Sequence, residues 1–163
     1  MSGAGLSADD LAYVIYEADN IAAGADRREA EGDLNDRGAK FDSDLCLENI
    51  FNVFSGDAEP SYFSLRELDA MKKENFPHGN KSIATQGQYA SIMRYMEKNF
   101  RMKSPISMEE NELLRVLEDK LIYVPSSTNT EEHADISLYD HMKMTGATAA
   151  VLMKYMKTLG ITD

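Results

Sequence analysis

Two short polar segments, far apart in the chain, carry the side chains that could bind a metal ion. The first holds Asp19 inside an apolar helical pattern, and the second holds the adjacent pair Asp140 and His141. Imidazole and carboxylate groups are the ligand types that manganese, nickel, cobalt and zinc accept in proteins. Burying such a group without a partner is costly, so polar residues within an apolar helix need either a partner or a ligand.

Each of these residues also has a plain structural explanation. Asp19 could pair with Arg27 or Arg28, or it could cap a neighbouring helix. His141 could be a hydrogen-bonded core residue, and one Asp-His dipeptide is a weak signal because adjacent helical residues point about 100° apart. By composition alone, the structural explanation is favoured for both. The other polar residues of the two segments are expected to be structural: Asn20, Asp26, Arg27 and Asp135.

The remaining reactive side chains form no catalytic pattern. His78 lies in a Pro/Gly turn and His133 in an acidic loop, so both are expected to be exposed. Cys46 has apolar neighbours and is expected in the core. A single cysteine excludes an internal disulfide and suits a reducing cytoplasm. The sequence also contains no Gly-rich phosphate loop and no nucleophile elbow.

Length and composition are typical of one globular domain. The chain has 163 residues, of which 43% are hydrophobic and 28% are charged, so we predict a single domain over residues 1–163. No stretch approaches the roughly 20 apolar residues that a membrane span needs, and the N-terminus lacks the pattern of a signal peptide. The expected location is the cytoplasm, with no membrane partner.

The chain is strongly acidic, with 28 Asp and Glu against 17 Lys and Arg and a net charge of −11. This charge argues against a protein that binds nucleic acid through a broad basic surface. It does not exclude a local basic strip. The best such strip lies mostly at helical spacing, and its simplest explanation is a solvated helix face: Arg94, Lys98, Arg101 and Lys103.

Hydrophobic periodicity predicts an all-α fold, an irregular arrangement of about six helices. Ser7 is the expected N-cap of the first helix and Gly24 its expected end, while Gly160 is expected to end the last helix. The candidate core positions include Leu11, Ile15, Ile21 and Met93. The other predicted helices cover residues 45–56, 66–73, 82–102, 107–121 and 137–159, with a short extended stretch at 62–65 and loops at 29–43 and 123–129.

Four segments together resemble one protein family. They are Tyr13–Gly24 followed by Asp26-Arg27-Arg28, then Leu47–Phe54, Val124–Thr128 and Asp135–His141. Their residues and their order along the chain resemble the N-terminal HD-type region of the large subunit of type III-A (Csm) CRISPR effector complexes. The resemblance covers nearly the whole chain, and the combination is more specific than any single segment.

The resemblance implies an HD-superfamily-like helical domain, a metal-dependent nuclease for single-stranded DNA. In that family the region is followed by palm domains that make cyclic oligoadenylates from ATP. The resemblance also implies Asp19, His141 and Asp140 as metal ligands. The metal would be a divalent ion (Mn, Ni, Co or Zn), provided that another segment completes the site. The implied partners are other Csm subunits, CRISPR RNA and target RNA through the complex, and single-stranded DNA.

The chain departs from the family pattern in two ways. The His-Asp dipeptide that names the HD superfamily is absent, and so is the Gly-Gly-Asp-Asp motif of the palm. The chain therefore resembles the later part of the HD region. We expect a helical scaffold that contributes part of a metal site to an RNA-guided antiviral complex, and that is inactive alone. The alternative is a non-catalytic helical module for protein–protein interaction, whose polar segments are purely structural.

Overall fold

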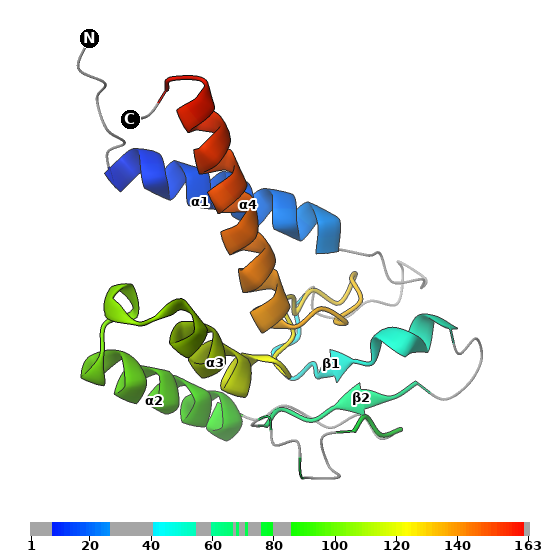
Figure 1. Ribbon diagram of the computed structural model, residues 1–163. Helices are drawn as coiled ribbons and strands as arrows, with labels where there is room; N and C mark the ends of the chain where they lie inside the picture. The colour runs from blue at the N-terminus through cyan, green and yellow to red at the C-terminus, as the bar shows by residue number, and fades with distance from the viewer. Residues whose placement is uncertain are drawn as a thin grey trace. The chain divides into compact units, whose positions relative to one another are not determined.

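The computed structural model describes residues 8–26, 41–54, 60–66, 68, 71, 76–79 and 86–161. This part of the chain is mostly helical, with four α-helices and one two-stranded sheet (Figure 1), which confirms the predicted all-α class. The chain divides into two compact units, residues 1–27 with 140–163 and residues 28–139. The assignment of residues 1–163 to a single domain stays a prediction.

None of the helices that the structure describes is both long enough and apolar enough to cross a membrane.

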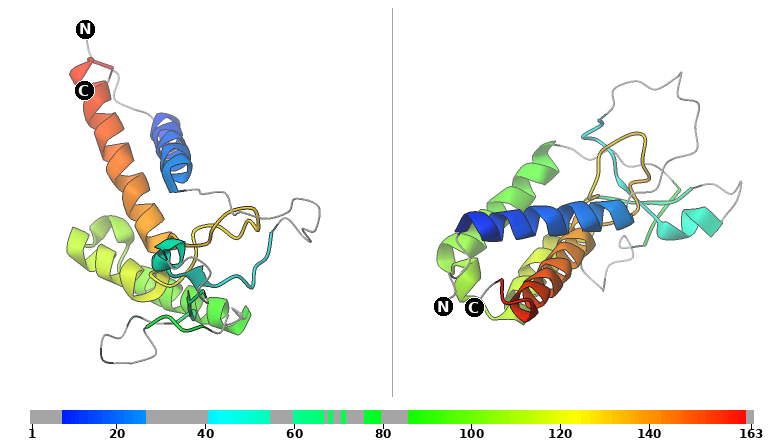
Figure 2. Two further views of the ribbon diagram at one scale, coloured as in Figure 1. Left: turned by 90° about the vertical axis from the view of Figure 1, so that its right-hand side faces the viewer. Right: turned by 90° about the horizontal axis from the view of Figure 1, so that it is seen from above.

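The first unit is built from two helices that cross each other, α1 (Ala8–Asp26) and the part of α4 (Leu138–Thr158) from Asp140 onward (Figure 2). Ala18 is fully buried at 0% exposure, and it packs with Val14 and Ala149. Small side chains at this position let the two helices approach closely. Three partly buried residues of α4 complete the contact: Leu152, Met153 and Met156.

The contact with α4 buries only one stripe of α1. Val14, Ala18 and Ala22 are buried and lie four residues apart, which places them on one face of the helix. Three other apolar residues that the sequence places in the core are exposed instead: Leu11, Ile15 and Ile21. This part of the prediction is wrong because α1 has apolar residues on several sides, and α4 covers one side only.

The ends of the two helices differ in how well the sequence predicts them. Gly160 follows α4 with a φ of +68°, a conformation that glycine adopts readily. The amides of Gly160 and Ile161 bond to the carbonyls of Lys157 and Met156, both at 3.1 Å, in a Schellman motif. Gly24, by contrast, lies inside α1, which continues to Asp26. The predicted N-cap Ser7 lies outside the described residues.

The second unit has its core between α2 (Gln86–Met102), α3 (Glu110–Leu121) and the segments around them. Cys46 is 2% exposed and belongs to this core, as predicted. Periodicity predicts Met93 in the core, but this residue is 60% exposed, because the face of α2 that packs inward carries Tyr89, Ile92 and Met96. The other buried residues of this core are Leu65, Leu121, Val124 and Tyr139.

Of the predicted helix at 45–56, the described residues 45–54 form a short strand and a 3-10 helix instead of an α-helix. Strand β1 (Leu47–Glu48) pairs antiparallel with β2 (Tyr62–Phe63), and a short 3-10 helix, η1 (Ile50–Phe54), follows β1. The side chains of Asn49 and Asn52 both bond to Ser61, and such side-chain bonds compete with a helical backbone.

The elements predicted after β1 agree only partly with the structure. The predicted extended stretch at 62–65 is confirmed where β2 lies. Of the predicted helix 66–73, Arg66, Leu68 and Met71 are described and are not helical, and its other residues lie outside the described part. The segment Pro105–Ser107, where the sequence predicts the start of the next helix, forms a separate 3-10 helix, η3.

Candidate functional site

His141 lies in the first turn of α4, and its imidazole ring is held between two carboxylates of α1. The ring atom Nδ1 is 2.8 Å from Oδ2 of Asp26, and Nε2 is 3.0 Å from Oδ1 of Asp19. Asp19 and Asp26 are about two helical turns apart and therefore lie on one face of α1. The fold thus brings two of the predicted metal ligands, Asp19 and His141, into direct contact.

The two carboxylates differ in their exposure to solvent. The side chain of Asp26 is 16% exposed and that of His141 is 14% exposed, whereas the side chain of Asp19 is 57% exposed. The bond between Asp26 and His141 is therefore the inner one. A ligand from solvent can reach the cluster from the side of Asp19.

The two contacts require a positive charge in the cluster. Burial lowers the pKa of His141, but the hydrogen bonds to Asp26 and Asp19 outweigh it and raise that pKa above 6.5. If Nδ1–H donates to Asp26, the Nε2 atom of the neutral ring presents a lone pair to a carboxylate oxygen of Asp19. Two acceptors at 3.0 Å repel each other unless a cation lies between them, either a proton or a metal ion.

The other predicted residues of the two segments lie elsewhere. Asp140 is exposed on α4, and its carboxylate is not one of the two that contact the imidazole nitrogens. Asn20 is exposed, Asp135 is buried in the second unit, and Arg27 lies outside the described residues. Within the described ranges, no group of three or more His, Cys, Asp and Glu side chains is arranged to hold a metal ion.

Asp26 takes a larger part in the cluster than the sequence suggests. The sequence predicts a structural role for it, and its bond to the inner nitrogen of His141 is compatible with such a role. The signal that could have singled it out is its spacing from Asp19, which places both carboxylates on the same face of one helix.

The other two histidines are not exposed as predicted. His133 is partly buried, with Nδ1 3.0 Å from a carboxylate oxygen of Glu48. His78 is partly buried as well, with Nε2 3.1 Å from the hydroxyl of Ser64. Both predictions relied on local composition, whereas both partners come from the segments of β1 and β2, which are distant in sequence.

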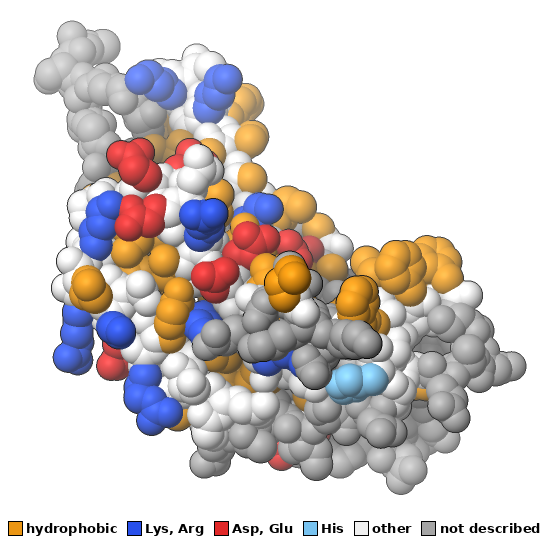
Figure 3. Space-filling model, turned by 60° about the horizontal axis from the view of Figure 1, so that its bottom comes forward, with side chains coloured by type: hydrophobic (Ala, Val, Ile, Leu, Met, Phe, Trp, Pro, Cys, Tyr) orange, Lys and Arg blue, Asp and Glu red, His pale blue; other side chains and the backbone are white. Residues whose placement is uncertain are grey.

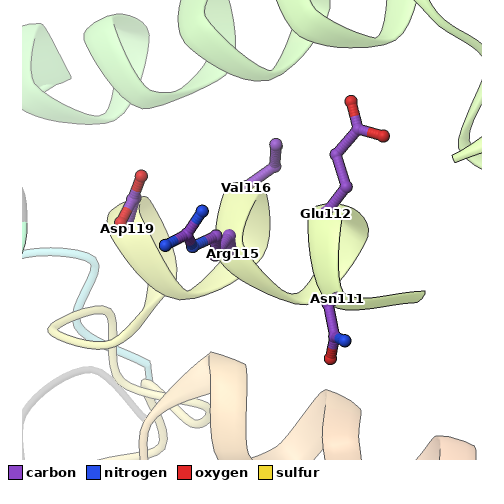
Figure 4. Close-up of a pocket in the computed structure, with 5 residues that line it drawn as sticks. All are labelled: Asn111, Glu112, Arg115, Val116 and Asp119. Atoms are coloured by element: carbon purple, nitrogen blue, oxygen red, sulfur yellow. The ribbon is translucent and has the colours of Figure 1, made fainter. Parts of the chain in front are cut away.

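A separate pocket of about 370 Å³ lies along α3 (Figure 4). Glu112 and Val116 point to one side of the helix, while Asn111 points to the other. The remaining lining residues, Arg115 and Asp119, add one charge of each sign. The lining contains none of the predicted metal ligands, so this pocket is not part of the cluster at His141.

Comparison with known proteins identifies the family. No protein-family model matches the chain. The CRISPR system single-strand-specific deoxyribonuclease Cas10/Csm1 (subtype III-A) of Mycobacterium tuberculosis is 35% identical over 163 residues, which covers 97% of this chain and 19% of that protein. The protein of the same description from Streptococcus thermophilus is 36% identical over 157 residues, which covers 95% of this chain and 21% of that protein.

Solved structures agree with this assignment. The chain matches the apo Csm1–Csm4 cassette with a TM-score of 0.61 and 27% identity, over 91% of this chain and 17% of that one. The chain spans about a fifth of the length of the curated relatives that it matches. Similarity over nearly all of its residues, in sequence and in structure, places this chain in the Cas10/Csm1 family of subtype III-A CRISPR systems.

Proposed function

We propose that this chain is part of the large subunit of a type III-A CRISPR interference complex. In this proposal its two-helix unit contributes part of the metal site of a nuclease that cleaves single-stranded DNA. The relatives are named as single-strand-specific deoxyribonucleases, which favours this function over a purely structural module. The observation that carries the proposal is the cluster in which Asp19 and Asp26 flank the ring of His141.

The contact inside the cluster brings two metal-binding donors together. Nε2 of His141 and Oδ1 of Asp19 are 3.0 Å apart, so these two groups would hold the ion after a small reorientation of the exposed Asp19 side chain. Both groups are suitable donors for manganese, nickel, cobalt or zinc.

Asp26 is suited to orient the histidine rather than to bind the metal. A histidine that binds a metal usually donates its other ring N–H to a carboxylate, which sets the tautomer and the ring orientation. The buried bond between Asp26 and Nδ1 has this arrangement. Asp26 thereby keeps the proton on Nδ1 and directs the lone pair of Nε2 toward Asp19.

The proposed site needs further ligands. A bound divalent ion would supply Lewis-acid polarisation of a phosphodiester, and catalytic zinc sites, for example, use three protein ligands. The described residues provide two, Asp19 and His141. We propose that the other donors come from another polypeptide segment, with Asp140 a further candidate in the assembled site. The chain alone is then inactive.

The proposed partners follow from the family. One solved relative is a Csm1–Csm4 cassette, so we propose a Csm4-type subunit as a partner of the assembled protein. CRISPR RNA and target RNA would be reached through the complex, and single-stranded DNA would be the nuclease substrate.

Manganese binding to the 163-residue chain tests the metal site directly. Titration followed by the EPR signal of free Mn²⁺ should give one weak site in the wild type. Asp19→Asn or His141→Gln should abolish that site, and Asp26→Asn should weaken it by about 10- to 100-fold. Asp119→Asn, which removes an exposed carboxylate of α3, should leave it unchanged. Circular dichroism would verify that each variant keeps its helix content.

Unchanged manganese affinity in both Asp19→Asn and His141→Gln would contradict the proposed site. A cleavage assay with labelled single-stranded DNA and Mn²⁺ provides the second test. We expect no turnover by the isolated chain, and robust turnover that Asp19→Asn abolishes would show that the site is complete without another segment.

A further inference from the structure

The exposed face of α2 carries a row of basic residues. Arg94, Lys98 and Arg101 are all exposed, and their spacings of four and three place them on one side of the helix. Figure 3 shows Lys and Arg side chains gathered along its left-hand edge, the side on which α2 lies in Figure 1. This row stands out because the chain as a whole has a net charge of −11.

Only part of this row is compensated by acidic groups. Arg101 lies 3.9 Å from Glu97, and Lys103, just after the helix, contacts Glu112. Arg94 and Lys98 have no acidic partner within the described part of the chain, and they are four residues apart, where like charges repel across one helical turn. Two like charges one turn apart do not stabilise α2, and an anion bound between them would relieve their repulsion.

The N-terminal half of the same face carries only small side chains. Gly87, Ala90 and Ser91 are exposed and lie one or two turns before the cations on the same side of α2. Side chains of this size leave room for an extended polymer along the helix. Met93 is 60% exposed next to Arg94 and offers an apolar surface to a nucleotide base.

We infer that this face of α2 binds the phosphodiester backbone of a single-stranded nucleic acid, with Arg94 and Lys98 as the phosphate contacts. The choice of a polynucleotide over an acidic protein rests on the proposed function, because the curated relatives are named as single-strand-specific nucleases. The site is distinct from the metal cluster, which is built from residues of α1 and α4. It would hold the strand rather than cleave it.

Fluorescence anisotropy with labelled oligothymidine tests the inference on the whole chain, in EDTA so that metal binding plays no part. Each phosphate contact with a single strand contributes about 0.7 to the slope of log affinity against log salt. The double variant Arg94→Gln/Lys98→Gln should therefore lower the slope by about 1.4 and weaken binding by about tenfold at low salt. Lys154→Gln/Lys157→Gln, which removes two exposed cations of α4, is the control with the same change in net charge.

The outcomes separate the proposal from its competitors. The proposal is supported if only the α2 variant loses affinity for oligothymidine and shows a smaller slope of log affinity against log salt. Equal binding of oligouridine by the wild type assigns the contact to the backbone that DNA and RNA share. Absent wild-type binding, or an equal loss in the α4 control, would overturn it. Polyglutamate competing as well as oligothymidine would overturn it in favour of an acidic protein partner. Because cleavage and metal are not involved, a failed metal site would leave these results unchanged.

Discussion

The two carboxylates that contact the ring nitrogens of His141 differ in their exposure to solvent, and they are suited to different roles. Asp26 is shielded and holds Nδ1, so it sets the orientation of the ring. Asp19 faces solvent, and its Oδ1 lies 3.0 Å from Nε2. We propose that the same three residues hold a proton in the free chain and a metal ion in an assembled site.

The protonation of His141 makes the stability of the first unit depend on pH. Carboxylate hydrogen bonds raise the pKa of His141 above 6.5 in the folded chain, so the folded state binds the proton more tightly than the unfolded state. This stabilisation is complete below the unfolded pKa and is lost as the pH rises through the folded pKa. In EDTA, we expect the midpoint of urea unfolding by circular dichroism to fall between about pH 6 and pH 8.

Histidine variants identify the source of that pH dependence. His141→Gln should remove most of the decrease, because glutamine cannot bind the proton. His133→Gln, which changes a partly buried histidine of the other unit, should retain it. The same decrease in His141→Gln and wild type would show that other groups cause it.

Asn52 supports the turn after β1 with a single side chain. Its amide nitrogen donates to the carbonyl of Ser61 at 2.9 Å, and its oxygen accepts from the Ser61 amide at 3.0 Å. Asn52→Ala removes both bonds and leaves the Ser61 amide without its partner, while the Ser61 carbonyl still accepts from the Asn49 amide at 3.0 Å. We therefore expect a loss of about 1–3 kcal/mol in the free energy of unfolding. Chemical denaturation would measure it.

Asn111→Ala provides the matched control for this prediction. Asn111 is exposed on α3, and we expect a change within about 0.5 kcal/mol. A loss of similar size in both variants would mean that the bonds to Ser61 are not what stabilises the turn.

At the scale of elements, two glycines in and just after α4 differ in their backbone conformation. Gly146 lies inside the helix, and an added Cβ would meet no atom within 4 Å. Gly160 also has open space around it, but its φ of +68° disfavours any other residue. The physical cause of an effect at these positions is therefore backbone conformation rather than packing.

Alanine at these two positions should change stability in opposite directions. Gly146→Ala should raise the free energy of unfolding by about 0.5–1 kcal/mol, because glycine is a poor helix former. Gly160→Ala should lower it by about 1 kcal/mol, because alanine is strained in the left-handed conformation that the Schellman motif uses. Thermal unfolding of both variants measures this difference. Destabilisation by Gly146→Ala would reveal a requirement for flexibility inside α4.

At the scale of the whole molecule, much apolar surface is exposed. Within the described part of the chain, no large side chain is less than 2% exposed, although a chain of 163 residues is long enough for a substantial core. η1 alone exposes Ile50, Phe51, Val53 and Phe54, with Phe54 at 82%. Hydrophobic side chains also gather on the right of the face in Figure 3. Apolar surface of this extent is typical of interaction sites.

This exposed surface predicts how the isolated chain behaves in solution. We expect strong fluorescence of the dye ANS in native buffer and an apparent mass in sedimentation that rises with protein concentration. Phe51→Ser/Phe54→Ser should reduce both effects, because these two rings lie 6.5 Å apart on one exposed segment. Dye fluorescence at the background level in the wild type would contradict this account.

The sequence by itself determined the features that depend on neighbours along the chain. Four helices follow from apolar periodicity, and the end of α4 follows from Gly160, because the bonds involved join residues three to five apart. The placement of Cys46 in the core follows from its apolar neighbours. The same local signals failed for residues 45–54, where Asn49 and Asn52 bond to the more distant Ser61.

Only the tertiary structure decided which distant residues meet. Asp19 and His141 were candidates by residue type and family resemblance, but their 3.0 Å contact and the supporting role of Asp26 depend on how α1 and α4 cross. Likewise, periodicity places Leu11, Ile15 and Ile21 of α1 in the core, whereas the contact with α4 buries only a single stripe of the helix. Periodicity reports which residues avoid water, and only the path of the chain determines which of them are covered.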